Sequence, residues 1–254
     1  MIDTHTHLYL PDFSEDFVPM MLRGENAGVR YYILPNIDAE SLPMMKDFHS
    51  RFPDNTFMTI GLHPTEVKED WEKHMNFMEK EIGKDKYVGI GEIGIDLYWD
   101  KSQIENQKKA FEYQLLLAQK LELPVIIHSR EALEEILEVI GKVKPTVPLI
   151  FHSFTGNLND VKRIREVCDP WFGINGVITY KNAAPLREAI PEIGLEKILL
   201  ETDSPYLTPV PHRGKRNESS YLGYIRDKIA QTLQVSPQII EKQTTLNASH
   251  IFKI

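Results

Sequence analysis

Short apolar runs separated by longer amphipathic stretches recur along the whole chain, and this alternation most restricts how it can fold. The runs are rich in β-branched residues, as buried strands are, and the stretches between them have helical spacing. Strands and helices that alternate in this way form a parallel sheet covered by helices. We expect strands at residues 2–8, 31–35, 56–61, 87–92, 124–128, 148–152, 171–174 and 197–202.

Helical spacing is clearest in residues 103–121, where Ile104, Phe111, Leu115 and Ala118 fall on one side of a helix. This segment lies between two predicted strands, as the connection of a parallel sheet should. Further helices are expected at residues 132–140, 182–190, 221–233 and 237–250.

Eight strands in order, each followed by a helix or a loop, predict one α/β domain over residues 1–254. The predicted fold is a single TIM-type (β/α)8 barrel, with its active site at the carboxyl ends of the strands. A doubly wound open sheet is the alternative. It would leave the first and last strands far apart, so a structure that places His5 beside Asp203 would exclude it.

Composition narrows the class of protein. The formal charge of -8 over 254 residues argues against a surface coated in basic residues for non-specific polyanion binding. The one cysteine, Cys168, cannot form an internal disulfide and suits a reducing compartment. The N-terminus lacks the pattern of a signal peptide, and no apolar stretch approaches the roughly 20 residues of a membrane span. We therefore expect a cytoplasmic protein without a membrane partner.

Ionisable side chains occur at the carboxyl ends of the predicted strands. Strands 124–128 and 148–152 read PVIIH and PLIFH, and each ends in a histidine. In a barrel these ends converge on one mouth, where the active sites of this fold lie. The residues at these ends are His5, His7, His63, Glu92, His128, His152 and Asp203.

Six of these side chains are a plausible ligand set for two divalent ions. They are His5, His7, Glu92, His128, His152 and Asp203. Each alone is more simply explained as a hydrogen-bonded structural residue or a turn residue. Buried unpaired polar groups cost several kcal/mol, however, so the set as a whole needs mutual partners or a metal. Zn²⁺, Mg²⁺ and Mn²⁺ all stay open as the metal.

Three of these positions have a more specific interpretation. His5 and His7 are two residues apart in an extended stretch and so face the same side. A two-metal centre needs an anionic bridge, which the carboxylate of Glu92 can provide. Glu201 shares a strand face with Asp203, and we interpret it as an acceptor that orients a ligand histidine, with a structural salt bridge as the alternative.

Positive charge concentrates in a basic loop after the last strand. The charged or ionisable residues of this loop are His212, Arg213, Lys215 and Arg216. Arginine forks bind phosphate oxygens bidentately, so the loop is a candidate for holding a nucleic-acid backbone, with a solvated surface loop as the alternative. Arg130, which with Ser129 follows the strand at residues 124–128, is a second candidate for binding phosphate. The alternative is that this segment only caps the next helix. Tyr98 and Trp99 offer a surface on which nucleic-acid bases could stack. The alternative is that these two rings only pack within the protein.

The sequence resembles the TatD family of metal-dependent deoxyribonucleases, in the amidohydrolase-like superfamily. The resemblance runs nearly end to end, through DTHTHL, GLHPTE, GEIGID, LPVIIHSRE, HSFTGN, GINGVITYKNA, LLETDSPYL and HRGKRNE. It implies a TIM-type barrel that binds divalent metal and hydrolyses DNA phosphodiesters, commonly from the 3′ end.

The resemblance also implies roles for single residues. One metal ion would be held by His5, His7, Glu92 and Asp203. Glu92 would bridge to a second ion, completed by His128 and His152. His63 and Arg213 match family positions near the scissile phosphate.

This chain departs from the family pattern at four positions. Thr6 stands where members often have cysteine, and Tyr9 where an acidic residue is common. Thr65 replaces a frequent histidine, and Ser219 follows Asn-Glu where proline is usual. None of these changes removes an expected ligand, but those near the mouth bear on substrate preference and exonuclease polarity.

The working hypothesis is metal-assisted hydrolysis of single-stranded DNA, as a 3′–5′ exonuclease. Asp203 would accept the proton of the attacking water, beside the bridging Glu92. His63, Arg213 or Arg130 would bind the phosphate, and His63 could also assist the leaving oxygen. The alternatives are a metal-dependent hydrolase of a small ester, cyclic amide or phosphoester, since fold and ligand set do not name a substrate, and a metal-stabilised binding protein without catalysis.

Overall fold

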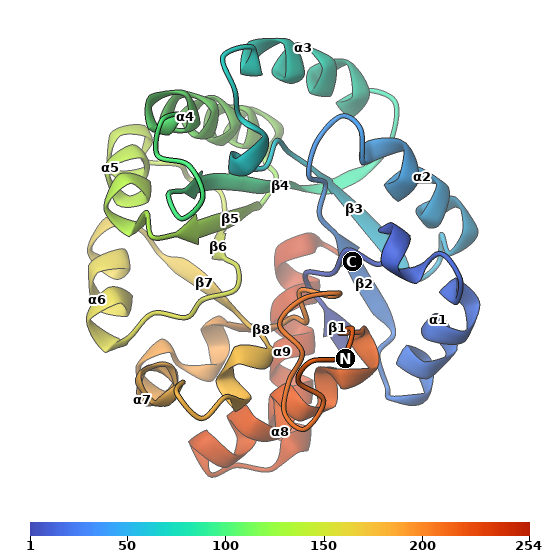
Figure 1. Ribbon diagram of the computed structural model, residues 1–254. Helices are drawn as coiled ribbons and strands as arrows, with labels where there is room; N and C mark the ends of the chain where they lie inside the picture. The colour runs from blue at the N-terminus through green and yellow to red at the C-terminus, as the bar shows by residue number, and fades with distance from the viewer.

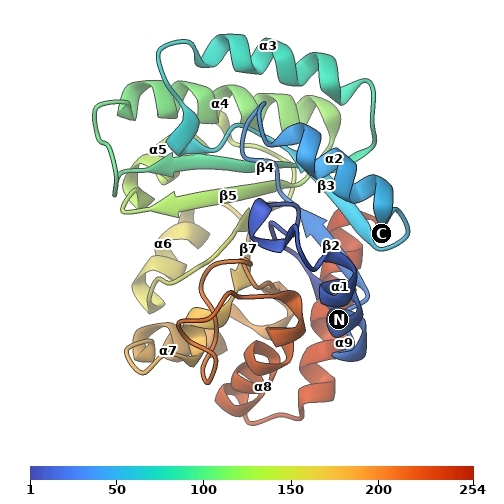
Figure 2. The same cartoon turned by 45° about the vertical axis from the view of Figure 1, so that its right-hand side comes forward.

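Eight parallel strands, hydrogen-bonded in their sequence order, form the centre of the computed structural model, which describes residues 1–254. Figure 1 shows these strands inside a ring of helices, and Figure 2 shows the same arrangement turned. The strands are β1 (Ile2–Asp3), β2 (Tyr31–Leu34), β3 (Thr56–Ile60), β4 (Tyr87–Asp96), β5 (Val125–Arg130), β6 (Leu149–Phe151), β7 (Pro170–Ile174) and β8 (Ile198–Leu200). The helices are α1 (Phe17–Asn26), α2 (Leu42–Arg51), α3 (Trp71–Ile82), α4 (Ile104–Leu121), α5 (Leu133–Val143), α6 (Leu158–Val167), α7 (Ala184–Ile193), α8 (Leu222–Leu233) and α9 (Pro237–Phe252).

Hydrogen bonds across the seam between β1 and β8 close the barrel. The backbone N–H of Thr4 donates to the carbonyl of Leu200 at 3.0 Å, and that of Asp203 donates to the carbonyl of His5 at 2.9 Å. His5 Nε2 consequently lies 3.7 Å from Asp203 Oδ1. An open sheet would separate these two residues, so the alternative is excluded and the TIM-type barrel predicted from the sequence is confirmed.

The expected strands are all present, but several differ in length: β8 spans only Ile198–Leu200 of the expected 197–202, and β1 and β4 differ most. β1 ends at Asp3, not at residue 8, because the next amides do not follow a regular ladder: Thr4 N bonds toward β8 and Thr6 N toward β2. β4 does not end at Glu92. It continues to Asp96, which pairs with Arg130 of β5, after a register shift between Ile90 and Ile93. The five expected helices correspond to α4, α5, α7, α8 and α9.

Apolar side chains fill the end of the barrel opposite the mouth. Ile2, Ile33, Val88, Ile126, Ile150 and Leu199 form a buried cluster with Ala248, Ile251 and Phe252 of α9. This cluster is separate from the larger core between the sheet and the outer helices, because alternate residues of a strand face opposite sides of the sheet. The final turns of α9 therefore close one end of the barrel and leave the polar strand ends at the other. None of the helices combines the length and the apolar character that crossing a membrane would require.

Buried Asp3 fastens the seam beneath the mouth. Its carboxylate accepts hydrogen bonds from the backbone and hydroxyl of Thr202, at 2.9 and 2.6 Å, and from Ser219 Oγ at 2.5 Å. Ser219, at the position where the family usually has proline, thus supplies a donor that a proline lacks. These bonds tie β1, the segment after β8 and the 3₁₀ helix η5 (Ser219–Tyr221) together.

A second anchor holds the basic loop against α1. Asp16 accepts hydrogen bonds from Arg23 at 2.7 Å and from both terminal nitrogens of Arg216 at 2.8 Å. Glu218 binds Arg23 on the other side, with Nε donating to Oε1 at 2.8 Å. Arg216 is therefore held within the fold, although it belongs to the basic loop that the sequence makes a candidate for binding a nucleic-acid backbone.

This anchor predicts acid sensitivity. Hydrogen bonds from Arg216 and Arg23 lower the pKa of Asp16 from its ordinary 3.8 to about 2. The ion pair therefore stabilises the native state fully above about pH 4, and this stabilisation is lost as the pH falls toward 2. Because the groups are partly exposed, we expect the stabilisation to be about 1 kcal/mol. We expect Asp16→Asn to unfold at lower urea concentration at pH 7 and to lose less stability on acidification. Asp47→Asn, which breaks an exposed pair with Arg51, is the matched control. Equal effects of the two changes would contradict this role of Asp16.

Candidate metal centre

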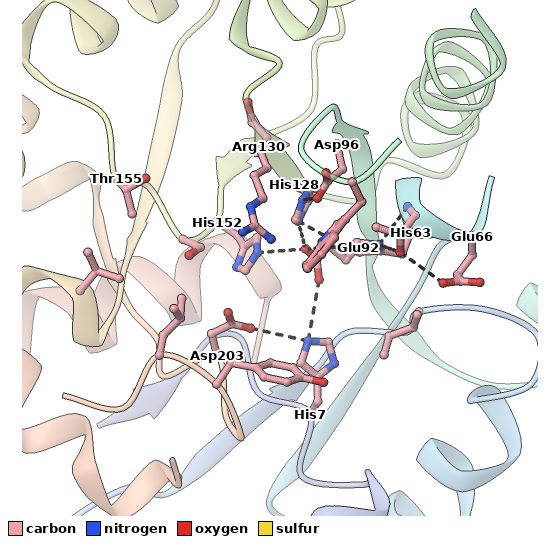
Figure 3. A pocket seen from close by; sticks show the side chains of 18 residues that line it. His7, His63, Glu66, Glu92, Asp96, His128, Arg130, His152, Thr155 and Asp203 are labelled. Carbon is pink, nitrogen blue, oxygen red and sulfur yellow. Dashed lines mark hydrogen bonds and ion pairs between the residues drawn. The ribbon is translucent and has the colours of Figure 1, made fainter. Parts of the chain in front are cut away.

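Glu92 lies at the centre of the barrel mouth, and its two carboxylate oxygens face different histidines (Figure 3). Oε2 lies 3.1 Å from His5 Nε2 and 3.8 Å from His7 Nε2. Oε1 lies 2.7 Å from His128 Nδ1 and 2.9 Å from His152 Nε2. One carboxylate thus stands between two groups of imidazoles, as a bridging ligand would.

The first group has the spacing of a metal site. His5 Nε2 and His7 Nε2 are 3.3 Å apart, and each lies 3.7 Å from Asp203 Oδ1. Ligand atoms held about 2 Å from a tetrahedral ion are about 3.3 Å from one another. One N–H···N hydrogen bond can join the facing nitrogens of His5 and His7, but His5 Nδ1 is buried without a partner. A cation would instead accept the Nε2 lone pairs of both rings. The residues present therefore fit a divalent ion.

The second group contains His63 as well as His128 and His152. His63 Nε2 lies 3.3 Å from Glu92 Oε1 and 3.2 Å from His128 Nδ1. Its other nitrogen, Nδ1, accepts a hydrogen bond from the backbone of Thr65 at 3.2 Å. In the neutral ring the proton is therefore on Nε2, which makes His63 a hydrogen-bond donor toward the centre rather than a ligand.

Tyr9 fixes the orientation of His7. Its buried hydroxyl donates to the carbonyl of Pro35 at 2.6 Å, which uses its only hydrogen. The contact between Tyr9 Oη and His7 Nδ1, at 3.1 Å, is therefore a hydrogen bond that the imidazole donates. With the proton on Nδ1, the lone pair of Nε2 is directed toward Glu92 and Asp203. Tyr9, which stands where an acidic residue is common in the family, is the acceptor of this hydrogen bond in this chain.

Carboxylates lie beside two of the three histidines of the second group, His128 and His152. His128 Nε2 lies 2.9 Å from Asp96 Oδ2, and His152 Nδ1 lies 3.4 Å from Glu201 Oε1. Glu201 reaches this position because Gly173 has no side chain, and a Cβ there would collide with the Glu201 carboxylate. The expectation that Glu201 faces a ligand histidine agrees with this geometry. Acceptors of this kind orient metal-binding histidines and raise their basicity.

Burial sets the charges of these side chains. It raises the pKa of Asp203 to about 8, to which the charge of Glu92 also contributes, and lowers the pKa of His7 to about 4. Burial also disfavours the charged form of Glu92, but the surrounding histidines outweigh it and hold the pKa of Glu92 well below its ordinary value. A divalent cation bound between these groups would favour the ionised form of Asp203 and the neutral form of His7, which are the forms that bind metal.

A cavity of about 710 Å³ opens above these groups and includes Arg130 in its wall. The Arg130 guanidinium lies 3.7 Å from the centre of the Tyr98 ring, and no carboxylate lies within ion-pair distance of it. Its side chain points into the cavity in Figure 3. Trp99 also lines the cavity and is 72% exposed, so packing does not account for it.

The basic loop contributes less to the cavity than the sequence suggests. His212 stacks on Tyr221 with ring centres 4.3 Å apart, and Arg216 is bound by Asp16, as described above. Arg213 does not line the cavity, and its guanidinium lies over the Tyr180 ring at 4.1 Å. A stretch of basic residues in a sequence does not show which of their charges are paired within the fold.

Several cavity residues were not expected from the sequence, among them Glu66, Asp96 and Tyr206. The signal for Asp96 was present, because it is four residues beyond Glu92 in an extended stretch and so lies on the same face. Glu66 and Tyr206 lie in loops, where no periodicity indicates which way a side chain points.

Comparisons with known proteins agree with this geometry. The family model described as "TatD related DNase" matches residues 2–253. An uncharacterized metal-dependent hydrolase of Bacillus subtilis, YabD, is 32% identical over 255 residues, which cover 100% of this chain and 99% of that protein. An uncharacterized metal-dependent hydrolase of Mycoplasma genitalium, MG009, is 34% identical, covering 98% of each. Among solved structures, YjjV, a TatD homolog from Escherichia coli K12, superposes with a TM-score of 0.93 at 27% identity, covering 100% of this chain and 98% of that one.

The contact between His7 and Tyr9 predicts a change in metal affinity. Tyr9→Phe removes the acceptor of the Nδ1 hydrogen bond, so His7 no longer prefers the tautomer that leaves Nε2 free. We expect the affinity of the metal-free protein for Zn²⁺ or Mn²⁺ to fall about tenfold or more in calorimetric titration.

Tyr32→Phe is the matched control, since it removes another buried tyrosine hydroxyl, which bonds to Val29 O at 3.3 Å away from the centre. Equal metal affinities of Tyr9→Phe and the unaltered protein would refute the role given to Tyr9.

Proposed function

Because the chain belongs to the TatD family of metal-dependent hydrolases, we propose that it hydrolyses the phosphodiester bonds of DNA, as a 3′–5′ exonuclease on single strands. The observation that carries this proposal is the meeting of two kinds of groups in one cavity. A ligand set for divalent ions forms its floor, and the unpaired guanidinium of Arg130 lies in its wall. Divalent ions and guanidinium groups are what a phosphodiester anion requires.

The ligand set divides into two sites around Glu92. His5, His7 and Asp203 would hold one ion with Glu92 Oε2, and His128 and His152 would hold the second with Glu92 Oε1. Bound divalent ions supply Lewis-acid chemistry, since they activate water and offset the negative charge on phosphoryl oxygens. Zinc and manganese suit the imidazole-rich set better than magnesium, which prefers oxygen ligands.

Asp203 is the base in this proposal. Its side chain is 14% exposed, whereas that of Glu92 is 3% exposed, so Asp203 is the more accessible of the two carboxylates. It also lines the cavity, where an attacking water would approach the phosphorus. In the ionised form its carboxylate would accept the proton of that water.

Arg130 and His63 act on the substrate. The ring of Tyr98 fixes the guanidinium of Arg130, whose in-plane N–H groups would bind the non-bridging phosphate oxygens. His63 presents its Nε2 proton to the centre, because Thr65 N donates to Nδ1, and would hydrogen-bond to a phosphate or leaving oxygen.

We propose that residues 1–254 form one catalytic domain. The free thiol of Cys168 suits the reducing cytoplasm, where we place the activity.

Substitution of the two central carboxylates tests the mechanism. We expect Asp203→Asn to lower kcat on single-stranded DNA about 10²- to 10⁴-fold, because it removes the proton acceptor, and Glu92→Ala to abolish binding of one or both ions. Asp169→Asn, which removes an exposed carboxylate paired with Lys197, is the control. Metal content is measured on each variant. Rates of metal-loaded Asp203→Asn close to those of the unaltered protein would rule out Asp203 as the base.

A substrate panel tests the reaction class and its direction. Single-stranded DNA labelled at either end should give mononucleotides from the 3′ end with Zn²⁺ or Mn²⁺ and no products with a chelator. Hydrolysis of small esters or cyclic amides by the same metal-loaded protein, without cleavage of any phosphodiester, would favour the alternative hydrolase.

A further inference from the structure

Arg213 is an exposed arginine whose position is fixed without an ion pair. Its guanidinium lies over the Tyr180 ring at 4.1 Å, and no carboxylate of the chain lies within ion-pair distance of it. Stacking occupies the face of a guanidinium and leaves its five N–H donors free in the plane of the group. Arg130 is held over Tyr98 in the same way inside the cavity.

Tyr180 is itself held firmly. Its hydroxyl donates to the carbonyl of Thr208 at 3.0 Å. Arg187 donates to its backbone carbonyl at 2.7 Å. The ring on which Arg213 rests is therefore fastened to α7 on one side and to the segment after β8 on the other.

The pair lies directly outside the cavity rim. Tyr180 follows the 3₁₀ helix η3 (Gly176–Thr179), whose Val177 lines the cavity. Thr208, which binds the Tyr180 hydroxyl, follows Leu207, another lining residue. Gly176 allows the two loops to touch, because a Cβ there would collide with the carbonyl of Leu207.

The loop that carries Arg213 is pinned at its base. Thr208 Oγ1 donates to the carbonyl of Lys215 at 2.6 Å. Asn217 Nδ2 donates to the carbonyl of Thr202 at 2.8 Å. Together with the Arg216–Asp16 pair, these bonds hold the loop beside the mouth, where Figure 2 shows it in orange between β7 and α8.

We propose that Arg213 and Tyr180 form an outer phosphate subsite for a single DNA strand whose scissile phosphate lies in the cavity beside Arg130. The inference rests on the proposed function and extends it. A substrate with one phosphate can use only the guanidinium inside the cavity. A polyanion that leaves the cavity over Val177 and Leu207 can bind the guanidinium groups of both Arg130 and Arg213. The protein should therefore have a higher kcat/KM on oligonucleotides than on small diesters.

Arg213→Gln is the test variant, and Arg30→Gln is its matched control. Arg30 is also exposed and lies over a tyrosine ring, that of Tyr31 at 5.2 Å, but at the opposite end of the barrel. Both changes remove one positive charge from an Arg–Tyr pair, so they differ only in position.

Two substrates are compared, a twelve-nucleotide single strand and bis(4-nitrophenyl) phosphate. We expect Arg213→Gln to lower kcat/KM on the oligonucleotide about threefold to fivefold at low salt, and to leave the small diester unaffected. Binding of the fluorescein-labelled oligonucleotide to the metal-free protein should weaken to a similar degree. The slope of log affinity against log salt should become shallower by about 0.7, the value for one phosphate contact on a single strand. Arg30→Gln should change none of these quantities.

The outcomes separate the two proposals. An equal loss of kcat/KM on both substrates would place Arg213 at the central phosphate and overturn the outer subsite. No loss of kcat/KM on either substrate would also overturn it. The same oligonucleotide loss in Arg30→Gln would show a general charge effect and also overturn it. Failure of the unaltered, metal-loaded protein to cleave either diester would refute the proposed function itself, and the outer subsite with it.

Discussion

The buried charge of Glu92 is the constraint on which the mouth of this barrel depends. A carboxylate removed from water is stable only when charged or hydrogen-bonding groups surround it closely. Here imidazoles from β1, β3, β5 and β6, or from the segments that follow these strands, approach its two oxygens. The barrel can bring these groups together because its closure across β1 and β8 places the first and last strands side by side.

The groups that support the histidines differ on the two sides of Glu92. His128 and His152 face carboxylates, those of Asp96 and Glu201. On the other side, His7 donates to the neutral hydroxyl of Tyr9. The Nδ1 atoms of His5 and of His152 both lack a hydrogen-bond partner. Carboxylate acceptors make an imidazole a stronger ligand than neutral acceptors do. The two halves of the centre therefore differ in the groups beside their histidines, with carboxylates at His128 and His152 and the Tyr9 hydroxyl at His7.

Much of this site could be predicted from the sequence, because parallel strands bring their carboxyl ends to one place. A polar residue at the end of an apolar run, as in VIIH or LIFH, was sufficient to locate His128 and His152. The extension of β4 to Asp96 was not predicted, since it depends on pairing with β5 after a shift in register. The contacts that Arg216 and Arg213 make within the fold were also beyond the sequence. Which partner a charged loop residue finds depends on contacts such as that with Asp16, two hundred positions away in the chain.

The central proposal is that Glu92 would bridge two divalent ions. A crystal grown with Mn²⁺, measured at an X-ray energy where manganese scatters anomalously, tests it most directly. The account predicts two anomalous peaks about 3.5–4 Å apart, one contacting Glu92 Oε2 with His5 and His7, the other contacting Oε1 with His128 and His152. A single peak, or two peaks of which only one contacts Glu92, would contradict it.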